Sequence, residues 1–232
     1  MAKLLSLLTC VALGFQSGSL AFEHTKVNPD LVVLGDSHFQ GPLGRILTDQ
    51  FLSDLNNFYI ESLCGSVFST FVNLGSTKCG YYTLTPDRTE MRSQTGQASD
   101  IIQRVTETPP RCLVVALGTN YAPFPTHQPL DQDIDALTRI AKPLRTKIFW
   151  LGPPDSRRFK KEVSLIDKYL RGKFQTPTKI AQFARYFSIH SECPYPETGG
   201  DGVHLKEPMM SMECINRLND FAATVFANCP PV

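Results

Sequence analysis

Short apolar runs alternate with amphipathic segments along most of the chain. The apolar runs predict five strands, over 31–34, 57–63, 112–117, 147–151 and 186–189. Apolar residues three or four apart predict helices around 43–51 and over 99–105, 131–144, 157–174, 178–184 and 208–227. Strands that alternate with helices are typical of a parallel sheet, so we expect a three-layer α/β/α, doubly wound domain of about five parallel strands.

The stretch over 65–95 departs from this order. It is rich in Gly, Ser and Thr, and its apolar residues follow no clear period. A long irregular segment within a compact domain is commonly functional, so we interpret it as an insertion that shapes a site. No internal repeat or linker-like stretch divides the remainder, and we therefore expect residues 22–232 to form one domain.

The first 21 residues have the layout of a secretory signal peptide. Lys3 supplies a positive charge, residues 4–15 are mostly apolar, and the small residues Ser19 and Ala21 stand where a signal peptidase reads the chain. The apolar run is shorter than the roughly 20 residues of a membrane-spanning helix, so a stable membrane anchor is disfavoured. We expect cleavage near Ala21 and a secreted or periplasmic protein.

Cleavage would also change the cysteine count. It removes Cys10 from the seven cysteines of the chain and leaves an even set. The six are Cys64, Cys79, Cys112, Cys193, Cys214 and Cys229. An even set in an exported protein predicts disulfides, for which about 15 complete pairings exist. Because no Cys-x-x-Cys pair occurs, a zinc site is disfavoured, and we expect no metal and no other cofactor.

The charge balance limits the possible partners. The chain carries 23 Lys and Arg against 22 Asp and Glu, and loss of Lys3 makes the two counts equal. Binding to phosphate backbones requires concentrated basic residues, which this near-neutral chain lacks, so we expect no nucleic-acid partner.

Polar clusters follow three of the predicted strands, and another precedes the last helix. They are Asp36-Ser37-His38 after 31–34, Gly65 after 57–63, Gly118-Thr119-Asn120 after 112–117, and Asp201 with His204 before 208–227. Ligands of parallel sheets collect at the carboxyl ends of the strands, so these residues are expected to meet. A serine activated by a histidine, a carboxylate that orients the histidine, and nearby N–H donors are the parts that acyl transfer needs.

These motifs, in this order over residues 31–226, resemble those of the SGNH (GDSL-type) serine hydrolase family. The resemblance implies the flavodoxin-like SGNH hydrolase fold, with Ser37 as the nucleophile, His204 as the base and Asp201 as its orienting partner. It also implies an oxyanion hole formed by Ser37, Gly65 and Asn120. Gly75 and Gly80 lie in the same irregular stretch and are alternatives to Gly65.

Other positions support or depart from the family pattern. Asp36 would order the serine turn, and Gly118 belongs to the third motif. The first motif continues with His38, where leucine is commoner in the family. The third continues with Tyr121, where many members have Asp. His38 and Thr119 are candidates for the pocket wall.

The predicted sheet favours one pairing of the cysteines. Helices run antiparallel to the strands that they follow, so the last helix begins on the active-site side of the sheet and ends on the far side. Cys193 and Cys214 then share the near side, while Cys112 and Cys229 share the far side. Cys64 and Cys79 remain to tether the insertion.

The leading interpretation is a secreted or periplasmic serine esterase that forms an acyl-enzyme on Ser37. The family resemblance suggests O-acetyl groups of carbohydrate or cell-wall polymers as substrates. Lysophospholipase, lipase and thioesterase activities are alternatives, as is transfer of the acyl group to a sugar. A non-catalytic carbohydrate-binding protein that retains the fold is a further alternative. The expected partner is a small ester or an acylated carbohydrate, and we expect a monomer.

Overall fold

The computed structural model of the chain describes residues 29–175, 180–195, 200–206 and 210–229. The predicted signal peptide over 1–21 lies outside these residues. So do parts of the predicted helices over 178–184 and 208–227.

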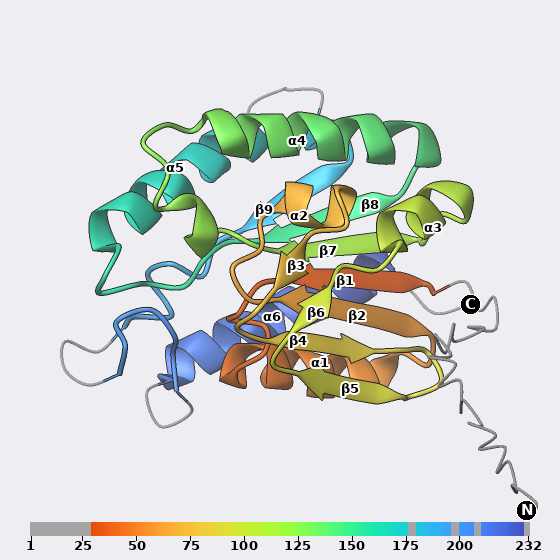
Figure 1. The fold of residues 1–232 in the computed structure, drawn as a ribbon, viewed down its shortest axis with the longest axis horizontal. Helices are drawn as coiled ribbons and strands as arrows, with labels where there is room; N and C mark the ends of the chain where they lie inside the picture. The colour runs from red at the N-terminus through yellow and green to blue at the C-terminus, as the bar shows by residue number, and fades with distance from the viewer. Residues whose placement is uncertain (1–28, 176–179, 196–199, 207–209, 230–232) are drawn as a thin grey trace, which may run out of the picture.

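Seven strands form one mixed sheet in the order β5-β4-β2-β1-β7-β8-β9 (Figure 1). Five of them are parallel, as the apolar runs predicted: β1 (Leu31–Gly35), β2 (Phe58–Leu63), β7 (Cys112–Ala116), β8 (Lys147–Leu151) and β9 (Ala184–Phe187). β9 begins two residues before its predicted start, because its pairing with β8 already joins Ala184 to Ile148.

The irregular stretch contributes the other two strands of the sheet. β4 (Tyr81–Leu84) pairs with β2 and β5 (Glu90–Ser93) pairs with β4, both antiparallel. A separate two-stranded ribbon joins β3 (Ser76–Thr77) to β6 (Gly96–Gln97). The insertion therefore extends the edge of the sheet, which the sequence pattern did not predict.

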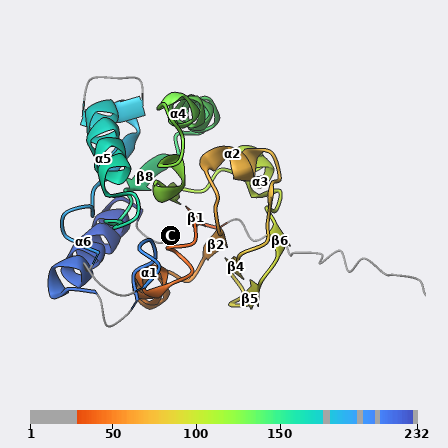
Figure 2. The same cartoon turned by 60° about the vertical axis from the view of Figure 1, so that its left-hand side comes forward.

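Helices cover both faces of the sheet, which confirms the three-layer α/β/α prediction (Figure 2). One face carries α1 (Pro42–Asp54) and α6 (Met212–Asn228), and the other carries α2 (Phe68–Val72), α3 (Ile101–Glu107), α4 (Gln128–Ala141) and α5 (Lys160–Gln175). Short 3-10 helices lie in the connections between strands and helices: η1 (Thr119–Tyr121), η2 (Lys142–Leu144) and η3 (Ile180–Gln182). Pro143 lies in η2 and cannot continue the hydrogen bonding of α4, so α4 ends before the predicted boundary at 144.

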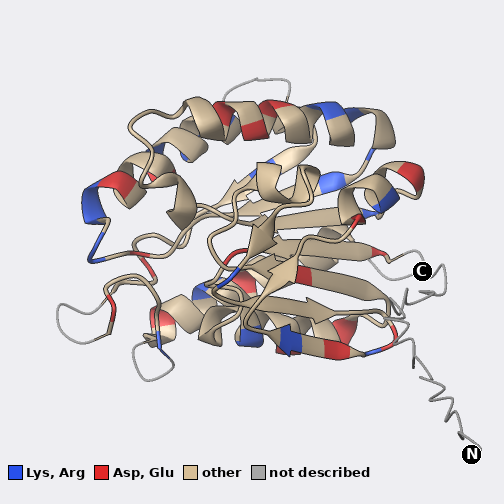
Figure 3. Cartoon of the chain, viewed as in Figure 1, with Lys and Arg blue, Asp and Glu red and all other residues tan. Residues whose placement is uncertain are grey.

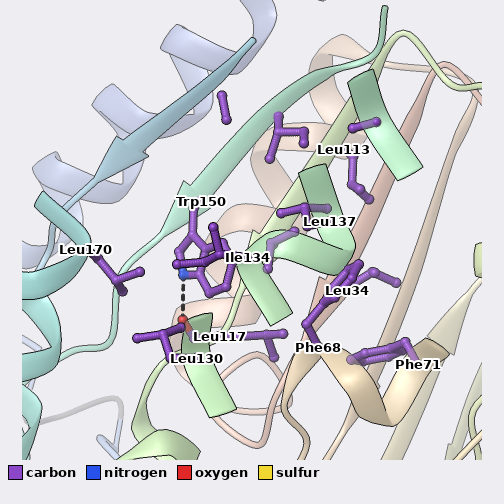
Figure 4. Packing of buried hydrophobic residues seen from close by; sticks show 14 of the residues in the cluster. Leu34, Phe68, Phe71, Leu113, Leu117, Leu130, Ile134, Leu137, Trp150 and Leu170 are labelled. Carbon is purple, nitrogen blue, oxygen red and sulfur yellow. Dashed lines mark hydrogen bonds between the residues drawn. The ribbon is translucent and has the colours of Figure 1, made fainter. Parts of the chain in front are cut away.

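The strands divide their side chains between two apolar layers. In β1, Leu31 and Val33 pack in the layer beneath α1 and α6, whereas Val32 and Leu34 pack beneath the other four helices. Trp150 of β8 lies in this second layer, where it is fully buried and its indole Nε1–H donates to the carbonyl oxygen of Leu117 at 2.8 Å (Figure 4). Trp150 is thus a core residue.

The six cysteines pair as the predicted sheet indicated. Cys64–Cys79 closes the start of the insertion, with Cα atoms 5.5 Å apart. Cys112–Cys229 joins the start of β7 to the end of α6 (6.1 Å), and Cys193–Cys214 joins the segment after β9 to the start of α6 (4.5 Å). Disulfides of this kind are typical of extracellular and periplasmic proteins.

Charges of both signs are interspersed on the outer elements. In Figure 3, basic and acidic residues share α3, α4 and β5. Among the described residues, none of the helices is long and apolar enough to cross a membrane.

The start of α1 packs very closely against the segment that follows β1. A Cβ atom on Gly44 would overlap the backbone carbonyl of Phe39. Since Phe39 lies two residues after Ser37, Gly44 allows the helix to approach the turn that carries this serine. By contrast, a Cβ atom on Gly172 in α5 would meet no atom within 4 Å.

We expect Gly44→Ala to lower the free energy of unfolding by roughly 1–3 kcal/mol, because the backbone of Phe39 must move. Gly172→Ala is the matched control, and it should stabilise the protein by up to about 1 kcal/mol through helix propensity. Urea unfolding measures both. Equal stability of the two variants would contradict the close approach at Gly44.

Candidate active site

The serine turn follows β1 directly. The N–H of Phe39 donates to the carbonyl oxygen of Asp36 at 3.1 Å, which closes the turn. The Asp36 side chain is buried, and its Oδ1 accepts the backbone N–H of His38 at 2.9 Å. The carboxyl group thereby fixes the backbone around Ser37, whose side chain is half-buried.

Ser37, His204 and Asp201 form one hydrogen-bonded chain. Nε2 of His204 lies 2.8 Å from Oγ of Ser37, and Nδ1 of His204 lies 2.5 Å from Oδ2 of Asp201. The other carboxylate oxygen of Asp201 accepts the backbone N–H groups of Val203 and His204, both at 2.8 Å. A single turn of chain therefore holds the carboxylate and orients the imidazole toward a serine that lies 167 residues away in the sequence.

The surroundings of Asp201 favour its ionised form. Partial burial raises the pKa of this carboxyl group. The hydrogen bonds from the ring and the backbone of His204, with that from Val203, outweigh this effect and hold the pKa below its ordinary value. An ionised carboxylate at this position fixes the tautomer of the imidazole and stabilises its protonated form.

Gly65 lies in the turn that follows β2. The N–H of Ser66 donates to the carbonyl oxygen of Leu63 at 3.2 Å, and Gly65 has a φ of 78°. This left-handed conformation favours glycine. The Ser66 hydroxyl donates to the carbonyl oxygen of Gly35 at 3.2 Å, which fastens the Gly65 turn to the end of β1.

The two alternative glycines of the insertion have other environments. Gly75 follows α2, and its N–H donates to the carbonyl oxygen of Thr70 at 2.8 Å. Gly80 precedes β4, and its carbonyl oxygen accepts a hydrogen bond from the side-chain amide of Gln40 at 2.9 Å. Gly65 is therefore the glycine that directly follows β2 in the turn beside the serine.

Asn120 lies in η1, just after β7. Its Nδ2 donates to the carbonyl oxygen of Ser66 at 3.0 Å and to Oδ2 of Asp36 at 3.4 Å. The N–H of Gly118 also donates to the Asp36 carboxyl group. Asn120 therefore contacts the turns after both β1 and β2, so its side chain links the turns at the ends of all three strands.

Burial shifts the pKa values of two groups beside Ser37. It raises the pKa of Asp36 to about 7, although hydrogen bonding and the nearby His204 oppose the shift. It lowers the pKa of His38 to about 3, and His204 reinforces that shift. Nε2 of His38 lies 3.0 Å from Oγ1 of Thr119, and both residues are buried. These two candidates for a pocket wall thus contact each other inside the protein.

Sequence reasoning missed the residues that hold the His204 turn. The Tyr195 hydroxyl accepts the N–H of Gly202 at 3.0 Å and lies 3.5 Å from Oδ1 of Asp201. The carbonyl oxygen of Gly202 accepts the hydroxyl of Ser156 and the N–H of Arg158, both at 2.9 Å. The contacts of Ser156 and Arg158 join the segment after β8 to the segment after β9, and the sequence pattern contains no signal for them.

Several solved structures share this fold. A GDSL-like lipase from Bacteroides thetaiotaomicron matches with a TM-score of 0.52 and 14% identity, over 85% of this chain and 87% of that chain. A carbohydrate esterase of family 3 from Talaromyces cellulolyticus matches with a TM-score of 0.55 and 13% identity, over 85% and 98%. A variant of an acetyl-xylooligosaccharide esterase from Geobacillus matches with a TM-score of 0.50 and 11% identity, over 89% and 97%.

By sequence alone the chain has no such counterpart. No protein-family model matches it, and no curated protein matches it. The likeness therefore lies in the arrangement of the strands and helices. The chain has the α/β fold of GDSL-type (SGNH) hydrolases.

The two buried groups beside Ser37 predict opposing effects of pH on stability. The pKa of His38 falls from 6.5 in the unfolded chain to about 3, so its contribution is present above pH 6.5 and is lost as the pH falls toward 3. The pKa of Asp36 rises from 3.8 to about 7, so its contribution is present below pH 3.8 and is lost as the pH rises through 7. Where these windows overlap, from pH 3.8 to 6.5, the two contributions change with pH in opposite directions.

Removing one of the two groups should therefore reveal how the other makes the free energy of unfolding depend on pH. We expect His38→Gln to gain stability relative to the wild type as the pH falls from 6.5 toward 4, by at most about 1.4 kcal/mol per pH unit. Asp36→Asn is the matched control and should change in the opposite direction. Urea unfolding at several pH values measures both effects. If the free energy of unfolding of both variants varied with pH as that of the wild type does, the assigned pKa shifts would be wrong.

Proposed function

We propose that this protein is a serine esterase that forms an acyl-enzyme on Ser37. The continuous hydrogen-bonded chain from Ser37 through His204 to Asp201 carries the proposal. A serine hydroxyl becomes an effective nucleophile when a neighbouring base accepts its proton, and His204 lies in position to do so. The shared fold of lipases and esterases adds support.

The acylation step transfers one proton through His204. As Oγ of Ser37 bonds to the ester carbonyl carbon, its proton passes to Nε2 of His204. The carbonyl oxygen becomes an oxyanion. When the carbon–oxygen bond to the leaving alcohol breaks, that alcohol takes the proton from Nε2, and the acyl group remains on Ser37.

The deacylation step repeats the same transfers with water. His204 accepts a proton from the water that attacks the acyl carbon. As the bond to Ser37 breaks, the same proton returns to Oγ, and the carboxylic acid is released. Asp201 remains ionised through both steps and stabilises the imidazolium.

The oxyanion would be held by donors from three turns. These are the backbone N–H groups of Ser37 and Gly65 and the side-chain amide of Asn120, at the ends of β1, β2 and β7. In this arrangement each donor would lower the barrier by roughly 3–4 kcal/mol. Asp36 and Gly118 support the turns from which the donors project.

For the substrate, we propose O-acetyl groups of carbohydrate or cell-wall polymers. The motif resemblance and the similarity in fold to enzymes described as carbohydrate and acetyl-xylooligosaccharide esterases support this class. The proposed setting is outside the cytoplasm, after cleavage near Ala21. The three disulfides support that setting because such bonds persist in oxidising compartments.

Replacing the nucleophile tests the proposed function. We expect Ser37→Ala to lower kcat/KM for an aryl acetate by about 10³-fold or more. A fluorophosphonate probe should label the wild type and not this variant. Ser53→Ala on the exposed side of α1 is the control and should leave both signals unchanged. Full turnover by Ser37→Ala would overturn the acyl-enzyme on Ser37, and no turnover by the wild type would leave a binding protein as the alternative.

A second experiment tests the substrate class. We expect release of acetate from acetylated polysaccharides, and faster turnover of acetyl than of butyryl or octanoyl aryl esters. Lysophospholipids and acyl thioesters serve as competing substrates in the same series. Faster cleavage of octanoyl esters or of a lysophospholipid would reject the acetyl-carbohydrate assignment in favour of a lipase.

A further inference from the structure

We propose that His38 and Thr119 are a pair of positioning residues that fix the oxyanion turn relative to the nucleophile turn. The inference rests on the proposed esterase function. His38 directly follows Ser37, and Thr119 directly precedes Asn120. The contact between Nε2 of His38 and Oγ1 of Thr119 at 3.0 Å therefore joins the neighbour of the nucleophile to the neighbour of a candidate oxyanion donor.

The contact is well protected from water. His38 is 7% exposed and Thr119 is 3% exposed. Removing one partner of a hydrogen bond that is buried in this way lowers the free energy of unfolding, because water cannot replace the lost hydrogen bond. The two turns, 81 residues apart in the sequence, are thus held together by an interaction that resists separation.

The chemistry makes the distance between the two turns important. In the tetrahedral intermediate, Oγ of Ser37 and the oxyanion are bonded to the same carbon atom. The amide of Asn120 must therefore lie at a fixed distance from Ser37 while it donates to that oxygen. A displacement of about 1 Å in such an arrangement can cost roughly 100-fold in rate.

Two other contacts join these turns at Asp36, a hydrogen bond from the N–H of Gly118 and a long one from Asn120, and the second of these is less suited to this task. Nδ2 of Asn120 lies 3.4 Å from Oδ2 of Asp36, but this amide is the group that would donate to the oxyanion. The shorter His38–Thr119 contact uses neither the Ser37 hydroxyl nor the Asn120 amide. It can hold the turns in place while both of these groups engage the substrate.

The imidazole of His38 also suits a site beside His204. The two rings lie 5.3 Å apart between centroids. Burial lowers the pKa of His38 to about 3, so it stays neutral at ordinary pH and places no second positive charge next to His204. A leucine here, the commoner residue of the family, would provide no hydrogen bond to Thr119.

The experiment compares two variants of Thr119 on an aryl acetate, with rates expressed per site titrated by a fluorophosphonate. We expect Thr119→Val, which loses the hydroxyl at similar volume, to lower kcat about tenfold with KM changed less than about twofold. Thr119→Ser keeps the hydroxyl and should retain most of the activity. His38→Leu should match Thr119→Val, and the double variant should be no slower than either, since one interaction is lost in all three.

Thr146→Val is the matched control for the loss of a buried threonine hydroxyl. Thr146 is 1% exposed, and its Oγ1 donates to the carbonyl oxygen of Pro110 at the amino ends of β7 and β8, away from the site. This variant should lose stability with kcat per titrated site unchanged. The same behaviour in Thr119→Val would reject the positioning role.

The outcomes also separate this inference from the proposed function. An inactive Ser37→Ala together with an unchanged kcat in Thr119→Val would reject the positioning pair and leave the esterase intact. Full activity of Ser37→Ala would reject the acyl-enzyme on Ser37, whatever the result at Thr119.

Discussion

The parallel pairing of β1 with β2 on one side and β7 on the other is the constraint from which the site follows. Gly35 pairs in register with Ser62 and with Ala116, so the three strands end at almost the same level. The backbone turns within a few residues of the end of each strand, and Asn120 joins the three turns through hydrogen bonds to Ser66 and to the Asp36 carboxyl group. Shifting one strand by a residue would reverse which side chains face each apolar layer, so the packing of the core also fixes the alignment of the site.

The segment that carries Asp201 and His204 does not directly follow one of these strands. Asp201 and His204 lie in a loop whose side chains are 56% and 44% exposed, so burial contributes little to their placement. Hydrogen bonds at Gly202 hold this segment instead, and the Cys193–Cys214 disulfide joins the chain before it to the chain after it. An exposed histidine is accessible to substrate and to water, and both must reach it in the proposed reaction.

The sequence predicts those features of the structure that are encoded in short stretches of the chain. The five parallel strands are continuous apolar runs, and the cysteine pairs follow from the sides of the sheet on which they lie. β5 was missed because all four of its residues are exposed, so it carries no apolar alternation and owes its conformation to pairing with β4. The contacts of Ser156 with Gly202 and of Thr119 with His38 join distant segments, and no pattern along the chain encodes them.

Within the site, the environment gives different properties to residues of the same type. Of the two carboxyl groups, Asp36 is buried and its pKa is raised to about 7, whereas hydrogen bonds hold the pKa of the exposed Asp201 below its ordinary value. Of the two histidines, His38 is kept neutral by burial, whereas the exposed His204 has one ring nitrogen beside Ser37 and the other beside Asp201. Environments that push like groups apart in this way distinguish the groups suited to the proposed reaction from those that hold the backbone. Residue type and spacing identify the candidates, and burial distinguishes those suited to the proposed reaction from those that hold the backbone.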